Sequence, residues 1–510
     1  MARQTRIQAP KGTRDLYPEE TARVRYIQKA WTDTAVRHGF EEIEGPTFET
    51  SELYAVKSGE GILGELFQAF SGKDPSDIEK VKATGRAPFA LRPEFTPTLA
   101  RMYAARAQQL QKPTKWFTAG PYFRAERPQR GRLREFLQWN VDVIGDDETP
   151  SGRAQADADC IATCIGLLES LGVESSVVKI NVNDRMKLDD LLVSEGVARE
   201  RMSEVHALLD RAEKMPREEW QRQATALGIS PSMGTLFVRE WSETEANLDE
   251  VIEQFKRYAT TSFQKLKAIR ESIVAPLDEF GISEKWCRPS LSIVRGLAYY
   301  TGTVFEAIAD GERAVAGGGR YDNLIELMGG PPTPAVGFAM GDVVLGLLLE
   351  DKGLMPEGAA LLDAISAPPA SRRPEVFVLG ADDDASDPLV RRLVADLRRG
   401  AESERYKHDS LKAWDPRRYE PATGGVRPMH ARQSYKSTRN LKKLLSDAER
   451  QFSRFAAIVH GEDRVQLRDL DKREEITPKD VPGLPDSVAE FSVSPDSEVY
   501  VGRAVQALLA

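Results

Sequence analysis

The stretch KWFTAGPYFRAERPQRGRLREFLQWNVDVIG, residues 115–145, decides how the rest of the chain is interpreted. Two runs rich in aromatic and aliphatic residues, 116–123 and 136–144, flank a polar loop. Runs of this kind are typical of strands, and the segment between them is typical of a turn. We therefore predict a β-hairpin with a cationic tip. The basic residues of the tip are Arg124, Arg127, Arg130, Arg132 and Arg134.

The charge of this loop has two interpretations. A run of charges is most often a solvated surface loop, but guanidinium groups also suit phosphate, because their planar fork donates two hydrogen bonds and stays charged. The second strand favours a binding role. Gln138, Asn140 and Asp142 recur at period two, so they share one face of the strand. The sequence thus predicts a polar pocket floor beside a polyanion clamp.

The order of residues in the hairpin resembles motif 2 of the class II aminoacyl-tRNA synthetases, and ERPQRGRLREF (126–136) is particularly similar to the histidyl-tRNA synthetase family. In that motif the first arginine holds the α-phosphate of ATP, the glutamate meets the adenine edge and the phenylalanine stacks on the adenine. The resemblance implies an ATP site made of Arg124, Glu126, Arg134 and Phe136.

Bulk properties are those of an ordinary globular protein. The chain has 510 residues, of which 41% are hydrophobic, so we expect two to four domains. Neither a run of eighteen apolar residues nor an apolar N-terminal segment occurs, which predicts a cytoplasmic protein without a membrane span. Three cysteines without CxxC spacing predict no structural metal site. The net charge of −9 argues against general coating of nucleic acid, although a local basic patch can still bind it.

The pattern along the chain predicts an α+β protein. Residues 187–286 are charged and helical in character, and 358–373 form an Ala/Pro/Ser-rich linker. The resemblance implies a class II catalytic core, an antiparallel sheet flanked by helices, over 1–186 and 287–357. It also implies that the helical segment is an inserted domain and that 374–510 is an α/β anticodon-binding domain. The helix and strand that follow Pro18 resemble motif 1, which implies a homodimer.

Three further segments resemble the amino-acid pocket of the family. LRPEFT (91–96) is similar to LRPEGT, whose Glu and Thr bind the amino group of histidine, so Phe95 has to point away from the ligand. RGLAYYTGTVFE (295–306) is similar to RGLDYYTGTVFE, and AGGGRYD (316–322) is similar to a second histidyl signature. The resemblance implies histidine contacts from Glu94, Thr96, Gln138, Asp142, Arg295, Tyr299, Tyr300 and Tyr321.

Roles follow for some of these residues. Arg124 and Arg295 are the predicted catalytic cations, which would stabilise the charge that develops on the α-phosphate during adenylation. In a regular strand Tyr299 and Tyr300 would face opposite sides. By resemblance Tyr300 contacts the imidazole and Asp142 accepts its other N–H, whereas packing is the favoured role for Tyr299.

Motif 3 is the largest departure from the family pattern. The segment GFAMGDVVL (337–345) has Asp342, Val343 and Val344 where the family has Leu, Glu and Arg. The absent arginine ordinarily pairs with the γ-phosphate and adenine of ATP. Either another residue, with Arg320 as a candidate, supplies the contact, or adenylation is weakened or absent.

The C-terminal region has a basic segment. Between Arg405 and Lys443 there are eleven Lys or Arg against three acids, with Trp414, Tyr419 and Tyr435 interleaved. Cations and aromatic platforms together suit single-stranded RNA, although a disordered insertion explains residues 408–430 equally well. The predicted tRNA contacts are Gln129, Arg130, Trp414, Arg417 and Lys436.

The resemblance thus implies a dimeric histidine–tRNA ligase. It would use ATP, with Mg²⁺, to form histidyl-adenylate and would transfer the histidyl group to the 3′ end of tRNA-His. The alternative is a non-catalytic, histidine-binding paralogue of the ATP phosphoribosyltransferase regulatory type, which the altered motif 3 favours. Such subunits typically lack the C-terminal domain and the RGLxYYTG signature. A general RNA-binding protein leaves Glu94, Arg124 and Arg295 unexplained.

Overall fold

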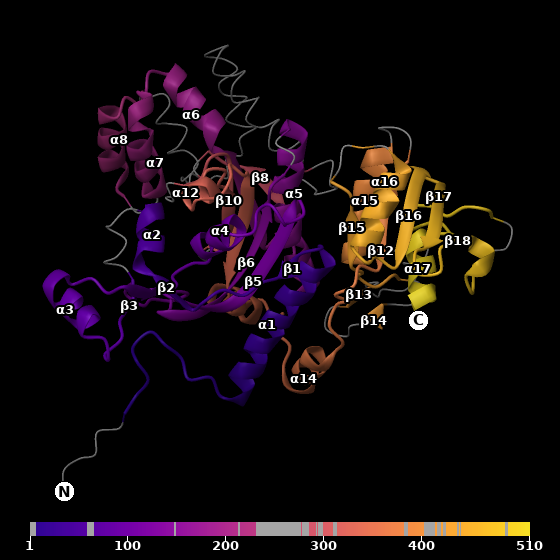
Figure 1. The fold of residues 1–510 in the computed structure, drawn as a ribbon, viewed down its shortest axis with the longest axis horizontal. Helices are drawn as coiled ribbons and strands as arrows, with labels where there is room; N and C mark the ends of the chain where they lie inside the picture. Colours follow the sequence, from indigo (N-terminus) through magenta and orange to yellow (C-terminus); the bar gives the residue numbers. More distant parts are fainter. Residues whose placement is uncertain are drawn as a thin grey trace, which may run out of the picture.

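Figure 1 shows the fold in a computed structural model of the chain. The structure describes residues 7–58, 66–146, 149–212, 215–230, 277, 285–291, 293, 299–309, 314–381, 386–401, 414–415, 420–421, 425–435, 438, 440–484 and 488–509.

The predicted hairpin is present and lies inside a large sheet. Strands β5 (Thr114–Phe123) and β6 (Glu135–Ile144) pair antiparallel over their whole length. The sheet order is β1-β5-β6-β11-β10-β9-β7-β8, with parallel pairs only at its two edges. The remaining strands are β1 (Glu41–Glu42), β7 (Val178–Asp184), β8 (Cys287–Pro289), β9 (Thr303–Ala309), β10 (Ala314–Arg320) and β11 (Ala335–Gly341). A mainly antiparallel sheet with helices packed on it confirms the predicted fold class.

Three helices pack on the sheet, and the hydrophobic core lies between them and the strands. They are α1 (Pro18–Arg37), α5 (Pro150–Ser170) and α13 (Asp342–Asp351). The apolar positions spaced three and four apart in α1, such as Ile27 and Trp31, are buried as their periodicity predicts. In the part of the chain that the structure describes, no helix is long and apolar enough to cross a membrane.

A second, smaller sheet lies at the loop end of the hairpin. Strands β2 (Phe48–Thr50), β3 (Gln68–Ala69) and β4 (Phe89–Leu91) form a three-stranded sheet with β4 in the middle. Its helices are α2 (Ser51–Ser58), α3 (Pro75–Thr84), α4 (Thr96–Ala104) and α12 (Leu324–Leu327). Because β4 leads directly into α4, residues 92–96 lie where a strand ends and a helix begins.

The described part of 187–286 is helical, as its composition predicts. It contains α6 (Arg185–Ser194), the short η2 (Arg199–Arg201), α7 (Met202–Asp210) and α8 (Arg217–Ala226). Side chains such as Leu191, Val205 and Trp220 are fully buried and belong to the same hydrophobic cluster as the sheet. The helices therefore pack onto the core (Figure 1).

The C-terminal part is a second α/β unit. Its sheet has the order β15-β12-β16-β17-β18, parallel on both sides of β12 and antiparallel beyond β16. The strands are β12 (Val376–Gly380), β15 (Ala431–Gln433), β16 (Phe455–Gly461), β17 (Arg464–Asp469) and β18 (Glu474–Ile476). The other elements are α15 (Ser386–Arg399), β13 (Trp414–Asp415), β14 (Glu420–Pro421), α16 (Leu441–Arg450), η5 (Pro478–Asp480) and α17 (Val501–Leu509).

The segment predicted as a linker, 358–373, is only partly irregular. Its first nine residues form α14 (Gly358–Ser366), which packs against α1. The sequence GAALLDAIS explains the difference, because Leu361 and Ala364 lie three residues apart and are both buried in the main core. Only the residues after Ser366 connect the two units without regular structure.

Candidate active site

A cavity of about 70 Å³ lies over the middle of the main sheet. Its floor comes from β6, β10 and β11, and its walls come from the turn before α4 and the residues before β9. The lining residues are Glu94, Thr96, Arg124, Gln138, Asn140, Asp142, Tyr299, Tyr300, Gly317, Tyr321, Gly337, Phe338 and Ala339. The structure thus brings seven of the predicted histidine contacts together, and it adds Arg124 at the mouth of the hairpin loop.

Asp142 is the most unusual group in this cavity. Its side chain is 2% exposed, and its Oδ1 accepts a hydrogen bond of 2.5 Å from the hydroxyl of Tyr321. Oδ2 has no hydrogen-bond partner among the residues that the structure describes. Burial raises the pKa of Asp142 to about 7, although the Tyr321 hydroxyl favours the ionised form. A buried acceptor of this kind needs a donor, and the cavity leaves room for one.

Gly337 makes the position of Asp142 possible. It pairs with Asp142 across β11 and β6. A Cβ atom at residue 337 would lie 1.9 Å from Oδ1 of Asp142, so any side chain there would displace the carboxylate. The sequence predicted a role for Asp142 but none for Gly337, Phe338 or Ala339. Their contribution depends on the pairing of β6 with β11, which joins residues about 200 positions apart.

The tyrosines correct one prediction. Tyr299 and Tyr300 do not face opposite sides, because they precede β9 and are not in a regular strand. Their rings are 4.7 Å apart, and Tyr299 also meets Tyr321 edge to face at 6.1 Å. Both line the cavity, so Tyr299 is part of its wall and does not merely pack in the core.

Glu94 and Thr96 lie at the junction of β4 and α4, and both line the cavity. Phe95 does not line it. This side chain is fully buried in a hydrophobic cluster with Leu99 and Tyr103. The replacement of glycine by phenylalanine therefore leaves the cavity open, as the sequence required.

The motif 2 residues form a second group beside the cavity. The guanidinium carbon of Arg124 lies 4.9 Å from the centroid of the Phe136 ring, within the range of a cation–π contact. Its Nη2 is 3.5 Å from Oε1 of Gln138. Arg124 thus stands between the aromatic ring predicted for adenine and the polar floor predicted for histidine.

Glu126 and Arg134 lie in the loop outside the cavity lining. Glu126 is ion-paired with Arg132, and the Arg134 side chain donates to the Glu126 carbonyl at 3.3 Å. The N-terminal segment supports this loop, because the Arg134 amide donates to the Gly12 carbonyl at 2.7 Å. Gln129 and Arg130 are exposed at the tip, where Arg130 pairs with Asp351 at 3.1 Å.

The start of α13 shows what replaces the missing motif 3 residues. Oδ1 of Asp342 accepts the Leu137 amide at 2.9 Å, and Oδ2 pairs with Arg14 at 2.6 Å. Val344, at the arginine position of the family, belongs to the main core. The cation held by Asp342 at this end of β6 is therefore Arg14, which the sequence did not indicate.

Arg320 is not a replacement for that arginine. Its guanidinium is buried and pairs with Asp157 at 2.7 Å, Asp146 at 2.8 Å and Asp322 at 3.1 Å. Burial alone would lower the pKa of Arg320, but these three carboxylates raise it above its ordinary value. The prediction that Arg320 could contact ATP is wrong, because its donors are already used to hold α5 against the sheet.

Several predicted residues lie outside the described part of the chain. They are Arg295, Arg417 and Lys436, and of Trp414 only the backbone, in β13, is described. Their roles stay predictions.

Comparison with known proteins identifies the family. The sequence profile described as histidyl-tRNA synthetase matches residues 12–342. The histidine–tRNA ligase of Thermococcus kodakarensis is 38% identical over 383 residues, which span 74% of this chain and 80% of the relative. The chain belongs to the histidyl-tRNA synthetase family. The ligase of Haloquadratum walsbyi is 39% identical over 68% of this chain and 75% of its own length.

Solved structures agree on the fold of this family. The crystal structure of histidyl-tRNA synthetase from Nostoc sp. PCC 7120 has a TM-score of 0.55 at 21% identity, covering 93% of this chain and 97% of that one. A Bacillus halodurans structure, titled as an ATP phosphoribosyltransferase regulatory subunit/histidyl-tRNA synthetase, has a TM-score of 0.53 at 22% identity and covers 75% of this chain and 88% of its own. The curated relatives above are named ligases, which favours the enzyme over the regulatory paralogue.

Proposed function

We propose that this chain activates L-histidine with ATP and transfers the histidyl group to the 3′ end of tRNA-His. The observation that carries this proposal is the Asp142 carboxylate, buried in the cavity with one oxygen unpaired among the described residues. An imidazole N–H is a donor of the right size for that oxygen. A site built around a buried acceptor rejects ligands that lack the donor, because the acceptor would stay unpaired.

The other cavity residues support an amino-acid ligand. Glu94, which also lines the cavity, offers a carboxylate for the α-ammonium group, and Thr96 lines the same cavity. Tyr299, Tyr300 and Tyr321 provide the aromatic walls that a flat ring requires.

Arg124 is placed to act on the α-phosphate. Attack by the histidine carboxylate concentrates negative charge on the phosphoryl oxygens, and a fixed cation stabilises that charge in the transition state. Arg124 lies between the amino-acid cavity and Phe136, so it can reach the junction of the two substrates. By resemblance Arg295 is the second catalytic cation, and Glu126, Arg134 and Phe136 hold the adenine side.

Magnesium, when bound, would neutralise the ATP phosphates. The described residues include no group of three or more His, Cys, Asp or Glu side chains placed to hold a metal. Mg²⁺ usually keeps several waters and is bound through substrate phosphates with one or two carboxylates, so it would arrive with the nucleotide.

The remaining assignments extend the same proposal. The chain would work in the cytoplasm as a homodimer through its motif 1 region, with 187–286 as an inserted domain and 374–510 as the anticodon-binding domain. Gln129 and Arg130 project from the hairpin tip and are exposed, as contacts to the acceptor end require. Trp414, Arg417 and Lys436 would contact the anticodon side of the tRNA.

The test is amino-acid-dependent exchange of labelled pyrophosphate into ATP, with histidine against the other nineteen amino acids. We expect exchange with histidine alone in the parent. Asp142→Asn should raise KM for histidine with little change in KM for ATP, whereas Arg124→Gln and Arg295→Ala should depress kcat. Histidine binding without exchange in the parent would refute the ligase and identify a histidine sensor.

A further inference from the structure

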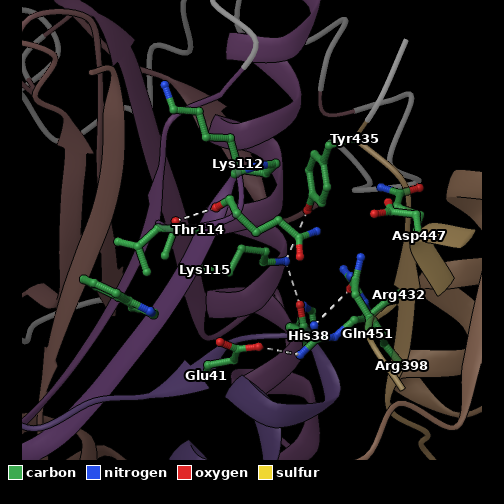
Figure 2. Close-up of a pocket in the computed structure, with 16 residues that line it drawn as sticks. His38, Glu41, Lys112, Thr114, Lys115, Arg398, Arg432, Tyr435, Asp447 and Gln451 are labelled. Carbon is green, nitrogen blue, oxygen red and sulfur yellow. Dashed lines mark hydrogen bonds and ion pairs between the residues drawn. The ribbon is translucent and has the colours of Figure 1, made fainter. Parts of the chain in front are cut away.

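A second cavity lies at the seam between the catalytic core and the C-terminal unit. It has a volume of about 110 Å³, many times the roughly 15 Å³ that one water needs. Helix α15 contacts α5 across this seam, and residues from β1, β5 and β15 reach into it. Figure 2 shows Lys115 and Tyr435 approaching each other from the two units, with Arg432 below them. No part of the proposed adenylation chemistry uses this cavity.

A buried carboxylate behind the cavity joins the two units. Asp159 of α5 is fully buried and pairs with Lys115 at 2.5 Å and with Arg398 at 2.9 Å. The Tyr435 hydroxyl donates to the same carboxylate. One acid is therefore shared by two buried cations, which leaves local positive charge uncompensated.

The rest of the lining leaves this excess of one positive charge unchanged. Arg432 lies beside Arg398, and burial lowers the pKa of Arg432 although its ion partner Glu41, 3.6 Å away, raises it. The Nε of Arg432 donates to His430 and its Nη1 to Gln451, so an added anion would be held by the remaining guanidinium hydrogens. His430 and His38 add no charge at neutral pH, because burial and the surrounding cations lower both of their pKa values. The charged residues that line the cavity are Lys112, Lys115, Arg398 and Arg432 against Glu41 and Asp447.

An uncharged hydrogen-bond donor, the side-chain amide of Gln433, also favours a ligand that supplies acceptors. Gln433 lines the cavity and is 5% exposed, and its Nε2 has no acceptor within the described ranges. An unpaired buried donor costs about 1–3 kcal/mol, so its presence beside clustered cations calls for an acceptor.

We propose that the seam cavity binds a phosphate-type oxyanion held by Arg432, Arg398 and Gln433. A tetrahedral oxyanion offers acceptors in several directions, which fits donors that come from β15 and α15 at once. A planar carboxylate could meet only one side of this set. The anion would neutralise the cations that Asp159 leaves uncompensated and would hold the two units together.

The first experiment uses inorganic phosphate and the full-length protein. Phosphate should raise Tm more than chloride at equal ionic strength, and calorimetry should give a phosphate Kd. We expect Arg432→Gln and Gln433→Leu each to weaken this Kd roughly tenfold. Gln433→Leu should leave the phosphate-free protein at least as stable as the parent, because it removes an unpaired donor. Arg124→Gln, in the other cavity, is the matched control and should retain seam binding.

Two sources of the oxyanion can be separated by titrating tRNA at several salt concentrations. If a backbone phosphate of RNA occupies the cavity, Arg432→Gln should reduce the salt dependence of tRNA binding by about one phosphate contact. If free phosphate occupies it, tRNA binding should be unchanged while the phosphate Kd is weakened. Phosphate affinity that is equal in the parent, Arg432→Gln and Gln433→Leu would overturn the proposal.

Discussion

Asp142 and Asp159 are both buried carboxylates, yet the chain treats them in opposite ways. Asp142 faces a cavity, accepts one tyrosine hydroxyl and has a pKa raised to about 7, chiefly by burial. Burial would also raise the pKa of Asp159, but Lys115 and Arg398 hold it well below its usual range. The first group has fewer donors than it can use, and the second has more cations than it can neutralise.

The difference separates a ligand site from a joint between domains. A carboxylate that the protein leaves underpaired must gain its partner from a substrate, whereas one saturated by cations fixes the elements that carry them. Asp142 lies on β6, inside one sheet, whereas Asp159 connects two helices, α5 and α15. Neutralising each acid in turn should therefore have opposite consequences.

The largest effect is expected for Asp159→Asn. It leaves Lys115 and Arg398 buried without their counter-charge, which should cost about 3–5 kcal/mol of unfolding free energy at pH 7.5. Because the pKa of Asp159 is lowered on folding, its stabilisation is present above its unfolded value near 4 and lost as pH falls below it. Urea unfolding at pH 7.5 and 3.0 should show a smaller loss at the lower pH. An equal cost at both values would contradict the assigned charge.

Asp142→Asn should behave in the opposite sense. A carboxyl whose pKa rises from about 4 to about 7 on folding loses on the order of 4 kcal/mol of stability when ionised. Because the pKa is raised on folding, the parent loses stability as pH rises from about 4 to about 7 and levels off above 7, so the variant should gain relative to the parent between pH 5 and 7 and stay level from 7 to 8. Urea unfolding over that range measures the difference, and a variant that lost stability with rising pH would refute the assignment.

The same variant separates stability from binding. Removing the charged acceptor should raise KM for histidine roughly tenfold to a hundredfold while the fold is retained. Asp159→Asn is the matched control, because it changes a buried acid outside the cavity and should leave KM for histidine nearly unchanged in whatever fraction stays folded.

The sequence was sufficient where a function depends on local pattern. The hairpin, the position of Glu94 at a strand end and the polar face of β6 all follow from periodicity and from residues close together in the chain. The motifs also indicated seven residues as predicted histidine contacts, and the structure gathers these seven in one cavity. What brought them together is strand pairing between distant segments, which a single sequence does not encode locally.

The predictions that failed involve partners far apart in the chain. Arg320 was a candidate for the missing motif 3 arginine, but two of its three carboxylate partners, Asp146 and Asp157, come from a distant part of the chain. The Asp159 cluster was missed because its residues, Lys115, Asp159 and Arg398, are far apart in the chain. Asp159 and Arg398, which contact each other, are 239 positions apart. Tyr299 and Tyr300 were assigned to opposite faces because a regular strand was assumed where the chain has none.

Asp342 pairs with one cation, which places it between Asp142 and Asp159. It leads to a further prediction. Its carboxylate accepts the Leu137 amide and pairs with Arg14, both at the start of β6. If Arg14 binds ATP in place of the family arginine that Val344 replaces, Arg14→Ala should raise KM for ATP roughly tenfold with little change in KM for histidine. Pyrophosphate exchange with varied ATP measures this. The control is Arg23→Ala. It removes an exposed ion pair to Glu350, which lies on the same helix as Asp342, α13.

The smallest effect on stability is expected for an ion pair that is exposed to water. Arg130 and Asp351 are 3.1 Å apart, but their side chains are 68% and 52% exposed, so water competes with the ion pair. Arg130→Ala should change the free energy of unfolding by less than about 1 kcal/mol. If the hairpin tip meets tRNA, the same change should nevertheless slow aminoacylation while leaving pyrophosphate exchange intact. Asp351→Ala breaks the pair without removing the cation and should affect neither, so a loss of aminoacylation in both variants would show that the pair orders the tip, and that Arg130 does not contact RNA itself.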